Sequence, residues 1–316
     1  MNWITVKNPL FANGPTDGFA RFHFEYTNSS PPEELFHYTS EVNLINIIKS
    51  GTMWATECTF LNDESELRAG IDVFREEVQS FDDILFVELI QSALGKWNDN
   101  SWMYFVVSLS ERGDLLSQWR AYANDGSGCS IALDAKSIRN RAGFGEFVGI
   151  DADKLPKETS NFYHLLRVVY IKSEKKDIAR RFLEQAKQQF DEFKLSDPAC
   201  DDKDHETFVL VVALRLKEFV ISFKNEEFAE EREWRVVSSL YRNDPAIDLR
   251  HTQYGIAPFT RTNLSPRGQI ESNRLPILRV ILGPRSKTKA NSKGLALLLE
   301  RMKYQPSITS SQCSYR

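Results

Sequence analysis

Hydrophobic and polar positions recur at two periods along the chain, and these periods predict a mixture of helices and strands. After a segment ending in His-Tyr-Thr, the apolar residues Leu44, Ile47 and Ile48 recur at helical spacing. Ser40 precedes them and can cap a helix, and Gly51 follows them where a helix often ends. This stretch therefore predicts a short strand, a helix and then a loop.

The same patterns predict the remaining elements. Strands are expected at Trp102–Ser108, Cys129–Leu133, Phe162–Ile171, Arg232–Leu240, Ile247–His251, Ile256–Thr260 and Leu275–Leu282, with a terminal strand after them. Helices are expected at 62–79, 83–96, 115–123, 175–194, 205–222 and 292–302. Because the strands are short and unequally spaced, they do not form a regular βαβ alternation. We predict an α+β fold with a mixed or antiparallel sheet core and inserted helices.

Changes in composition indicate how the chain is organised. Residues 1–32 are mixed and end in a Pro-rich turn, which indicates an N-terminal extension. Residues 33–316 are predicted to form a single α+β domain with a helical insertion at about 175–222. Residues 140–157 show no clear periodicity.

Charge and cysteine content limit the classes of function. The net charge is −4, so there is no global basic field of the kind that attracts nucleic acid. This net charge is still compatible with a local basic groove. The chain starts without a signal-peptide pattern and has no long apolar run, so we expect no membrane partner. The four cysteines lack metal-ligand spacing, which favours reduced thiols in the cytoplasm and no metal site.

The first candidate site is the strand end His37, Tyr38 and Thr39, directly before a helix N-terminus. An imidazole, a phenol and a hydroxyl beside unpaired helix amides suit a ligand with hydroxyls, an aromatic base and phosphate. The alternative is a core histidine with an aromatic neighbour.

The second candidate is the pair Ser108 and Ser110, which alternation in a strand places on one face, opposite Leu109. Two hydroxyls at a strand end can orient a neighbouring carboxylate or bind a ligand. They can equally cap the next element.

The third candidate is the pair Glu231 and Glu233, which share a face if a strand begins here. Adjacent carboxylates can hold a substrate hydroxyl, stabilise a cationic transition state and, through one raised pKa, accept a proton. The alternative is a solvated charge run on an edge strand. The apolar residues from Trp234 onward favour a strand that enters a core.

Three further residues are open to two interpretations. Lys224 can contact phosphate or pair with Glu226 or Glu227, and we favour pairing. Trp119 and Tyr122 lie three apart on a predicted helix, where core packing is commoner than stacking on a base.

The motifs together resemble a widespread, mostly bacterial family catalogued as domain of unknown function 2971. The resemblance rests on His37–Thr39, Asn62–Asp63, Ser108–Ser110, Gln118–Tyr122, Gly128, Glu231–Arg235 and Val280–Pro284, and it extends from Glu33 to the end.

The order of the three sites also resembles the ADP-ribosyltransferase fold, in which a His or Arg, a Ser-Thr-Ser or aromatic element and a Glu lie on successive strands. The resemblance implies NAD as substrate, no metal, catalytic Glu233 and Glu231, and a cofactor-binding set of His37, Tyr38, Thr39, Ser108, Ser110, Trp119 and Tyr122. Glu233 would stabilise an oxocarbenium-like transition state as nicotinamide leaves, and Glu231 would orient or deprotonate the acceptor.

The implied activity is that of an NAD-dependent ADP-ribosyltransferase-like enzyme that modifies a protein or nucleic acid, or of an NAD glycohydrolase. Stand-alone enzymes of this kind in bacteria are often toxins or anti-phage effectors. The chain departs from the pattern in reading Ser-Leu-Ser and in the long gap before Glu233. The alternatives are a non-catalytic nucleotide or nucleic-acid binding module, which the basic helix around Lys175 would suit, and hydrolysis of another glycosidic bond.

Overall fold

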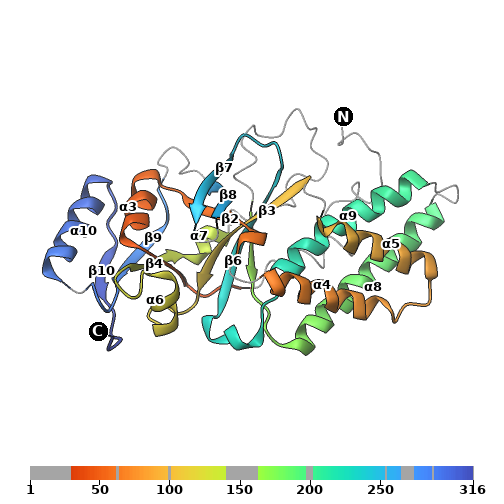
Figure 1. Ribbon diagram of the computed structural model, residues 1–316, viewed down its shortest axis with the longest axis horizontal. Coiled ribbons are helices and arrows are strands. Elements are labelled where there is room, and N and C mark those ends of the chain that lie inside the picture. The colour runs from red at the N-terminus through yellow and green to blue at the C-terminus, as the bar shows by residue number, and fades with distance from the viewer. Residues whose placement is uncertain are drawn as a thin grey trace.

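A ten-stranded sheet flanked by helices forms the centre of the protein (Figure 1). The structure, a computed structural model, describes residues 30–61, 64–98, 101–139, 163–196, 202–252, 255–264, 274–286 and 288–315. The predicted N-terminal extension, the irregular segment 140–157 and the Asn62–Asp63 pair lie largely or wholly outside these residues.

The sheet is mixed and mostly antiparallel. Its strands are β1 (Glu34–Thr39), β2 (Met53–Glu57), β3 (Trp102–Ser110), β4 (Cys129–Asp134), β5 (His164–Arg167), β6 (Glu233–Tyr241), β7 (Ile247–Thr252), β8 (Gly255–Thr262), β9 (Ile277–Leu282) and β10 (Ser307–Ser310). The order is β10-β9-β4-β1-β3-β2-β8-β7, and β6 pairs with β3 and β5. Among these pairs, β10 with β9 is parallel. The predicted α+β class is confirmed.

The helices follow the predicted periodicity closely. They are α3 (Glu41–Ser50), α4 (Glu64–Val78), α5 (Ile84–Gly95), α6 (Leu116–Tyr122), α7 (Ala135–Arg139), α8 (Lys172–Ser196), α9 (Asp202–Ile221) and α10 (Lys289–Arg301). The Ser40 side chain accepts a hydrogen bond from the Asn43 amide, and Gly51 ends α3 in the left-handed conformation with φ 66°. Among the described α-helices and strands, two were not predicted: the short helix α7, and β2, which occupies the segment expected to be a loop.

The two faces of the sheet carry different layers. Figure 1 shows α4, α5, α8 and α9 gathered at one end of the molecule, with α3 and α10 at the other. Alternate residues of β3 divide between the layers: Tyr104 and Val106 pack with the four-helix group, and Phe105 and Val107 pack with α3 and α10. The predicted helical insertion thus packs directly on the sheet, through α8 and α9.

The central strand β3 has a forked edge. Strand β6 pairs with β3 along its whole length, from Trp102 opposite Tyr241 to Ser110 opposite Glu233. Because a strand has two edges, β1 and β2 share the other one. Strand β1 meets it at Ser110, and β2 meets it at Phe105 and Val106. Strands β1 and β2 diverge between these points, and this divergence opens the space for the site described below. We call the place where they diverge the fork of β3.

Among the described residues, the helices are too short or too polar to cross a bilayer.

Candidate functional site

A cavity of about 500 Å³ lies at the fork of β3. Charged and hydroxyl side chains from several strands and one loop line it: His37 from β1, Ser108 and Ser110 from β3, Glu233 and Arg235 from β6, Arg250 and Thr252 from β7, and Lys224 and Glu231 from the segment before β6. Segments far apart in the chain thus supply one concave surface, part polar and part apolar, of the size that small ligands occupy.

The sequence of β3 explains why the sheet turns polar here. On the face that packs against α4, α5, α8 and α9, the strand reads Tyr104 and Val106, then Ser108 and Ser110. The register places Arg235 opposite Ser108 and Glu233 opposite Ser110. Directly opposite residues in an antiparallel pair share a face, so the hydroxyls and the charged groups lie together.

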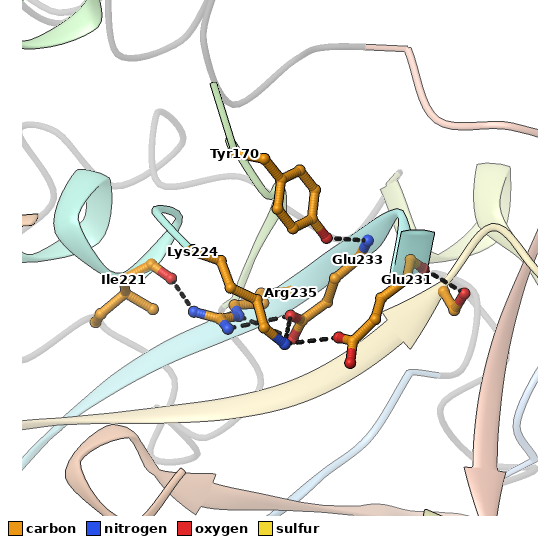
Figure 2. Close-up of polar contacts among 7 residues, drawn as sticks. Tyr170, Ile221, Lys224, Glu231, Glu233 and Arg235 are labelled. Carbon is orange, nitrogen blue, oxygen red and sulfur yellow. Dashed lines mark hydrogen bonds and ion pairs between the residues drawn. The ribbon is translucent and has the colours of Figure 1, made fainter. Parts of the chain in front are cut away.

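Lys224 joins the two carboxylates (Figure 2). Its Nζ lies 2.6 Å from Oε2 of Glu231 and 3.0 Å from Oε2 of Glu233. Arg235 binds Glu233 through two nitrogens, at 2.9 and 3.1 Å, and donates its third to the Ile221 carbonyl. Pairing of Lys224 was predicted, but Glu226 and Glu227 were the wrong partners: the ammonium is buried and turns inward.

Glu231 reaches this cluster from outside the strand. It ends a 3₁₀ helix (Glu226–Glu231), and Arg232 follows in the left-handed conformation with φ 43° before β6 begins at Glu233. The expectation that strand alternation places both glutamates on one face was therefore wrong. The turn at Arg232, not the pleat, brings the two carboxylates to the same ammonium group.

The environment separates the pKa values of the two glutamates. Burial would raise the pKa of Glu233, but Arg235 and Lys224 outweigh it and lower that pKa to about 2. Burial raises the pKa of Glu231, and Lys224 offsets this only in part. Burial also disfavours the charge of Lys224, yet Glu233 and Glu231 raise its pKa. Two carboxylates with opposite shifts suit a division between a fixed anion and a proton acceptor.

The two carboxylates also differ in their free lone pairs. A carboxylate has about four acceptor positions. Glu233 accepts from Lys224 and twice from Arg235, and a hydrogen bond from the Ser108 hydroxyl further lowers its pKa. Glu231 accepts from Lys224 through one oxygen. Glu231 is thus the carboxylate with more capacity for a ligand.

His37 is held in one tautomer at the fork. Its Nδ1 lies 3.0 Å from the Ser108 carbonyl oxygen, which can only accept, so Nδ1 carries the proton. Burial lowers the pKa of His37, the bond to Ser108 partly offsets this, and the positive charge of Arg250 lowers it further. A neutral ring protonated at Nδ1 has an acceptor lone pair on Nε2, which suits a ligand hydroxyl.

Ser108 and Ser110 both line the cavity, but they differ in burial and in hydrogen-bond partners. Ser110 is buried, and its hydroxyl donates to the Glu231 carbonyl at 2.6 Å and accepts from the Arg112 amide at 2.9 Å. Ser108 is exposed. Ser110 therefore fixes the turn that carries Glu231, whereas the Ser108 hydroxyl, which donates to Glu233, lines the cavity and can accept a hydrogen bond from a ligand.

The structure gives different positions to the three aromatic residues of the implied cofactor-binding set. Trp119 is fully buried and does not line the cavity, and its Nε1 donates to Asp114 at 2.7 Å. Tyr38 packs edge-on against Trp119, with centroids 4.8 Å apart, and its hydroxyl donates to the Arg112 carbonyl and accepts from the Leu115 amide. Tyr122 lines the cavity and is 36% exposed, which makes it the most exposed of the three rings. Thr39 lines the cavity but is buried.

The lining residues that sequence reasoning did not assign to a site include Trp54, Phe228, Arg235 and Arg250. Arg235 could have been found from the sequence, because it is a charged residue that interrupts the apolar run from Trp234 to Val237. Trp54 lies in the segment taken for a loop. Arg250 sits in a short polar strand, where no local pattern marks it. Among the described residues, the acidic, histidine and cysteine side chains form no metal-binding group.

Comparison with known proteins gives one match. Residues 118–236 match the family model DUF2971, described as a protein of unknown function. The match supports the resemblance to this family. It covers less than half of the chain and includes Lys224, Glu231, Glu233 and Arg235, whereas His37 and Ser108 precede it. No curated protein and no solved structure matches the chain.

Proposed function

We propose that the protein is an NAD-dependent ADP-ribosyltransferase-like enzyme, with the cavity at the fork of β3 as its active site. One observation carries the proposal: His37, Ser108, Glu231 and Glu233, which lie far apart in the sequence, line a single cavity. An acceptor for ribose hydroxyls, an exposed hydroxyl and two carboxylates are groups that suit cleavage of a cationic N-glycoside.

The proposed step is a substitution at the nicotinamide ribose. The bond between the ribose C1 atom and the nicotinamide nitrogen breaks, and its electron pair leaves with nicotinamide. A nucleophilic oxygen or nitrogen of the acceptor forms the new bond to C1, and Glu231 takes the acceptor's proton. When water is the acceptor, the products are ADP-ribose and nicotinamide.

We assign different roles to the two carboxylates. Glu233, whose pKa is lowered to about 2, stays anionic and supplies negative charge near the developing oxocarbenium ion. Glu231, whose pKa is raised and which has free lone pairs, suits proton acceptance. His37 Nε2 accepts from a ribose hydroxyl, and the ring of Tyr122 stacks on a base.

The test is calorimetric titration with NAD, followed by mass spectrometry for released nicotinamide. We expect release by the wild-type protein and loss of release in Glu233→Gln and Glu231→Gln. Glu230→Gln is the matched control, because Glu230 lies in the same acidic run but is exposed and does not line the cavity. Circular dichroism establishes that each variant is folded. Release at the wild-type rate in both active-site variants would overturn the proposal.

A second function is favoured by one observation. Lys224 and Arg235 neutralise Glu231 and Glu233 within the protein itself. Such a cluster suits a module that binds a nucleotide or nucleic acid without cleaving it. This alternative predicts ligand binding that survives the Glu231→Gln, Glu233→Gln double substitution, with no nicotinamide released by any variant.

The acceptor would be a protein or a nucleic acid. If nicotinamide is released, expression of the wild type and of Glu233→Gln in bacteria, with and without phage infection, tests a role as toxin or anti-phage effector. We expect growth arrest or phage resistance with the wild type alone.

A further inference from the structure

The cavity has a second charged end, formed by Arg250 of β7. Strand β7 pairs with β8, which in turn pairs with β2, so this end lies on the other branch of the fork from β1. The register places Arg250 opposite Ala257 and Phe259 opposite Thr56. Arg250 and Thr56 therefore lie on the same face of the sheet and both line the cavity.

The Arg250 side chain is positioned mainly by aromatic packing. Its guanidinium carbon lies 5.5 Å from the ring centre of Trp54 and 5.8 Å from that of Phe259. One nitrogen donates to the Thr56 hydroxyl at 2.5 Å. Flat rings beside a planar cation hold it in place without using its hydrogen-bond donors.

Among the described residues, one hydrogen-bond acceptor, the Thr56 hydroxyl, uses a donor of Arg250. Its Nε is buried and makes no hydrogen bond, and the side chain forms no ion pair with a carboxylate among the described residues. Arg235 differs, because Glu233 and the Ile221 carbonyl occupy all three of its nitrogens.

Arg250 is also the uncompensated charge of the cavity. At the other end, the two carboxylates of Glu231 and Glu233 balance Lys224 and Arg235. Among the lining residues that the structure describes, the remaining ionised side chain is Arg250. The protein carries a net charge of −4, so this positive charge is a local feature and not part of a general basic surface. A guanidinium with free donors matches the geometry and charge of phosphate.

We infer that Arg250, which lies over the neighbouring rings of Trp54 and Phe259, binds a diphosphate group of the ligand whose ribose contacts His37. The inference deepens the proposed function, because it assigns the diphosphate of NAD to the β7 end of the cavity. The binding itself requires no cleavage, so it also holds for a module that only binds nucleotides.

The experiment is calorimetric titration with inorganic pyrophosphate. Arg250→Met keeps a long side chain against the two rings and removes the charge. We expect it to weaken pyrophosphate binding by about 10-fold to 100-fold, the range for loss of hydrogen bonds to a charged group. Arg250→Lys keeps the charge and loses the planar fork, so we expect an intermediate loss.

Arg261→Met is the matched control. Arg261 also lies over the Phe259 ring, at 5.3 Å, but it pairs with Asp248 and does not line the cavity. We expect unchanged pyrophosphate binding in this variant. Failure of the wild type to bind millimolar pyrophosphate, or equal weakening in Arg250→Met and Arg261→Met, would overturn the inference. If Arg250→Met does not fold, the comparison of Arg250→Lys with Arg261→Met decides in the same way.

The failure of the inference and that of the proposed function are distinguishable. If pyrophosphate binding depends on Arg250 but no nicotinamide is released from NAD, the inference is supported and the proposed enzymatic function is contradicted. If nicotinamide is released and Arg250→Met leaves the KM for NAD unchanged, the proposed function is supported and the inference is contradicted.

Discussion

The carboxylates of Glu231 and Glu233 meet at one buried ammonium group, that of Lys224, although a left-handed residue separates them in the chain. The same contact stabilises the fold and sets the charge of the cavity. Stability and ligand binding therefore depend on the same few side chains, and substitutions here test both.

Removal of the central ammonium is expected to destabilise the protein strongly. Lys224→Met leaves two buried carboxylates next to each other, and breaking a buried ion pair costs about 3 kcal/mol or more. Urea unfolding followed by circular dichroism measures the change in unfolding free energy.

The control for this substitution is Lys176→Met, because Lys176 pairs with Glu76 on the surface. Exposed pairs contribute about 0.5 kcal/mol. Equal losses in the two variants would show that the buried cluster does not stabilise the fold.

The low pKa of Glu233 predicts a specific dependence of stability on pH. Its pKa is about 2 in the folded protein, against an ordinary value of 4.5. A depressed pKa contributes stability above pH 4.5, and that contribution is lost as the pH falls toward 2. Its size is on the order of 3 kcal/mol. Urea unfolding between pH 6 and pH 2 (a range of about 4 units) measures it.

We expect Glu233→Gln to lose less stability than the wild type across the same pH range, because the titrating group is gone. Glu230→Gln is the control, since Glu230 is exposed, and its pH profile should match that of the wild type. Parallel profiles for Glu233→Gln and the wild type would contradict the assignment of the low pKa to Glu233.

The two serines of β3 predict opposite effects of the same substitution. Ser110→Ala removes a donor to the Glu231 carbonyl and an acceptor for the Arg112 amide, so we expect a loss of about 2 kcal/mol. Ser108→Ala, at an exposed position, should cost less than about 1 kcal/mol and should weaken ligand binding instead. Thermal unfolding and NAD titration of both variants separate the two roles. A larger loss of stability in Ser108→Ala than in Ser110→Ala would reverse them.

A glycine next to the site predicts a steric effect. A Cβ on Gly128 would lie 2.2 Å from the carbonyl oxygen of Thr39 and 2.9 Å from that of Ala123. Both are backbone atoms that cannot move away cheaply, so Gly128→Ala should cost about 2 kcal/mol or more and displace the end of β1.

The control glycine is Gly95, the last residue of α5, where a Cβ would meet no atom within 4 Å. Because alanine favours helix over glycine by about 1 kcal/mol, Gly95→Ala should stabilise the protein slightly. Thermal unfolding compares the two variants, and a stable Gly128→Ala would show that β1 can shift without loss.

The amino-acid sequence by itself determined most of the elements and the location of the polar clusters. Helix α3 begins and ends where Ser40 and Gly51 indicate, and β3 occupies the aromatic and β-branched run that predicts it. These features depend on residues close together in the chain, which is why a local pattern reveals them. Strand β2 was missed for the same reason, because a strand of five residues beside a helix end has no distinctive period.

The tertiary structure decided which of these residues act together. The register between β3 and β6 places Glu233 opposite Ser110, and the sharing of one edge of β3 by β1 and β2 opens the cavity. Trp119 is fully buried, and Arg250 reaches the cavity from a strand that carries no local signal. Such relationships depend on pairing between distant segments, and the periodicity of a single segment contains no information about its partner.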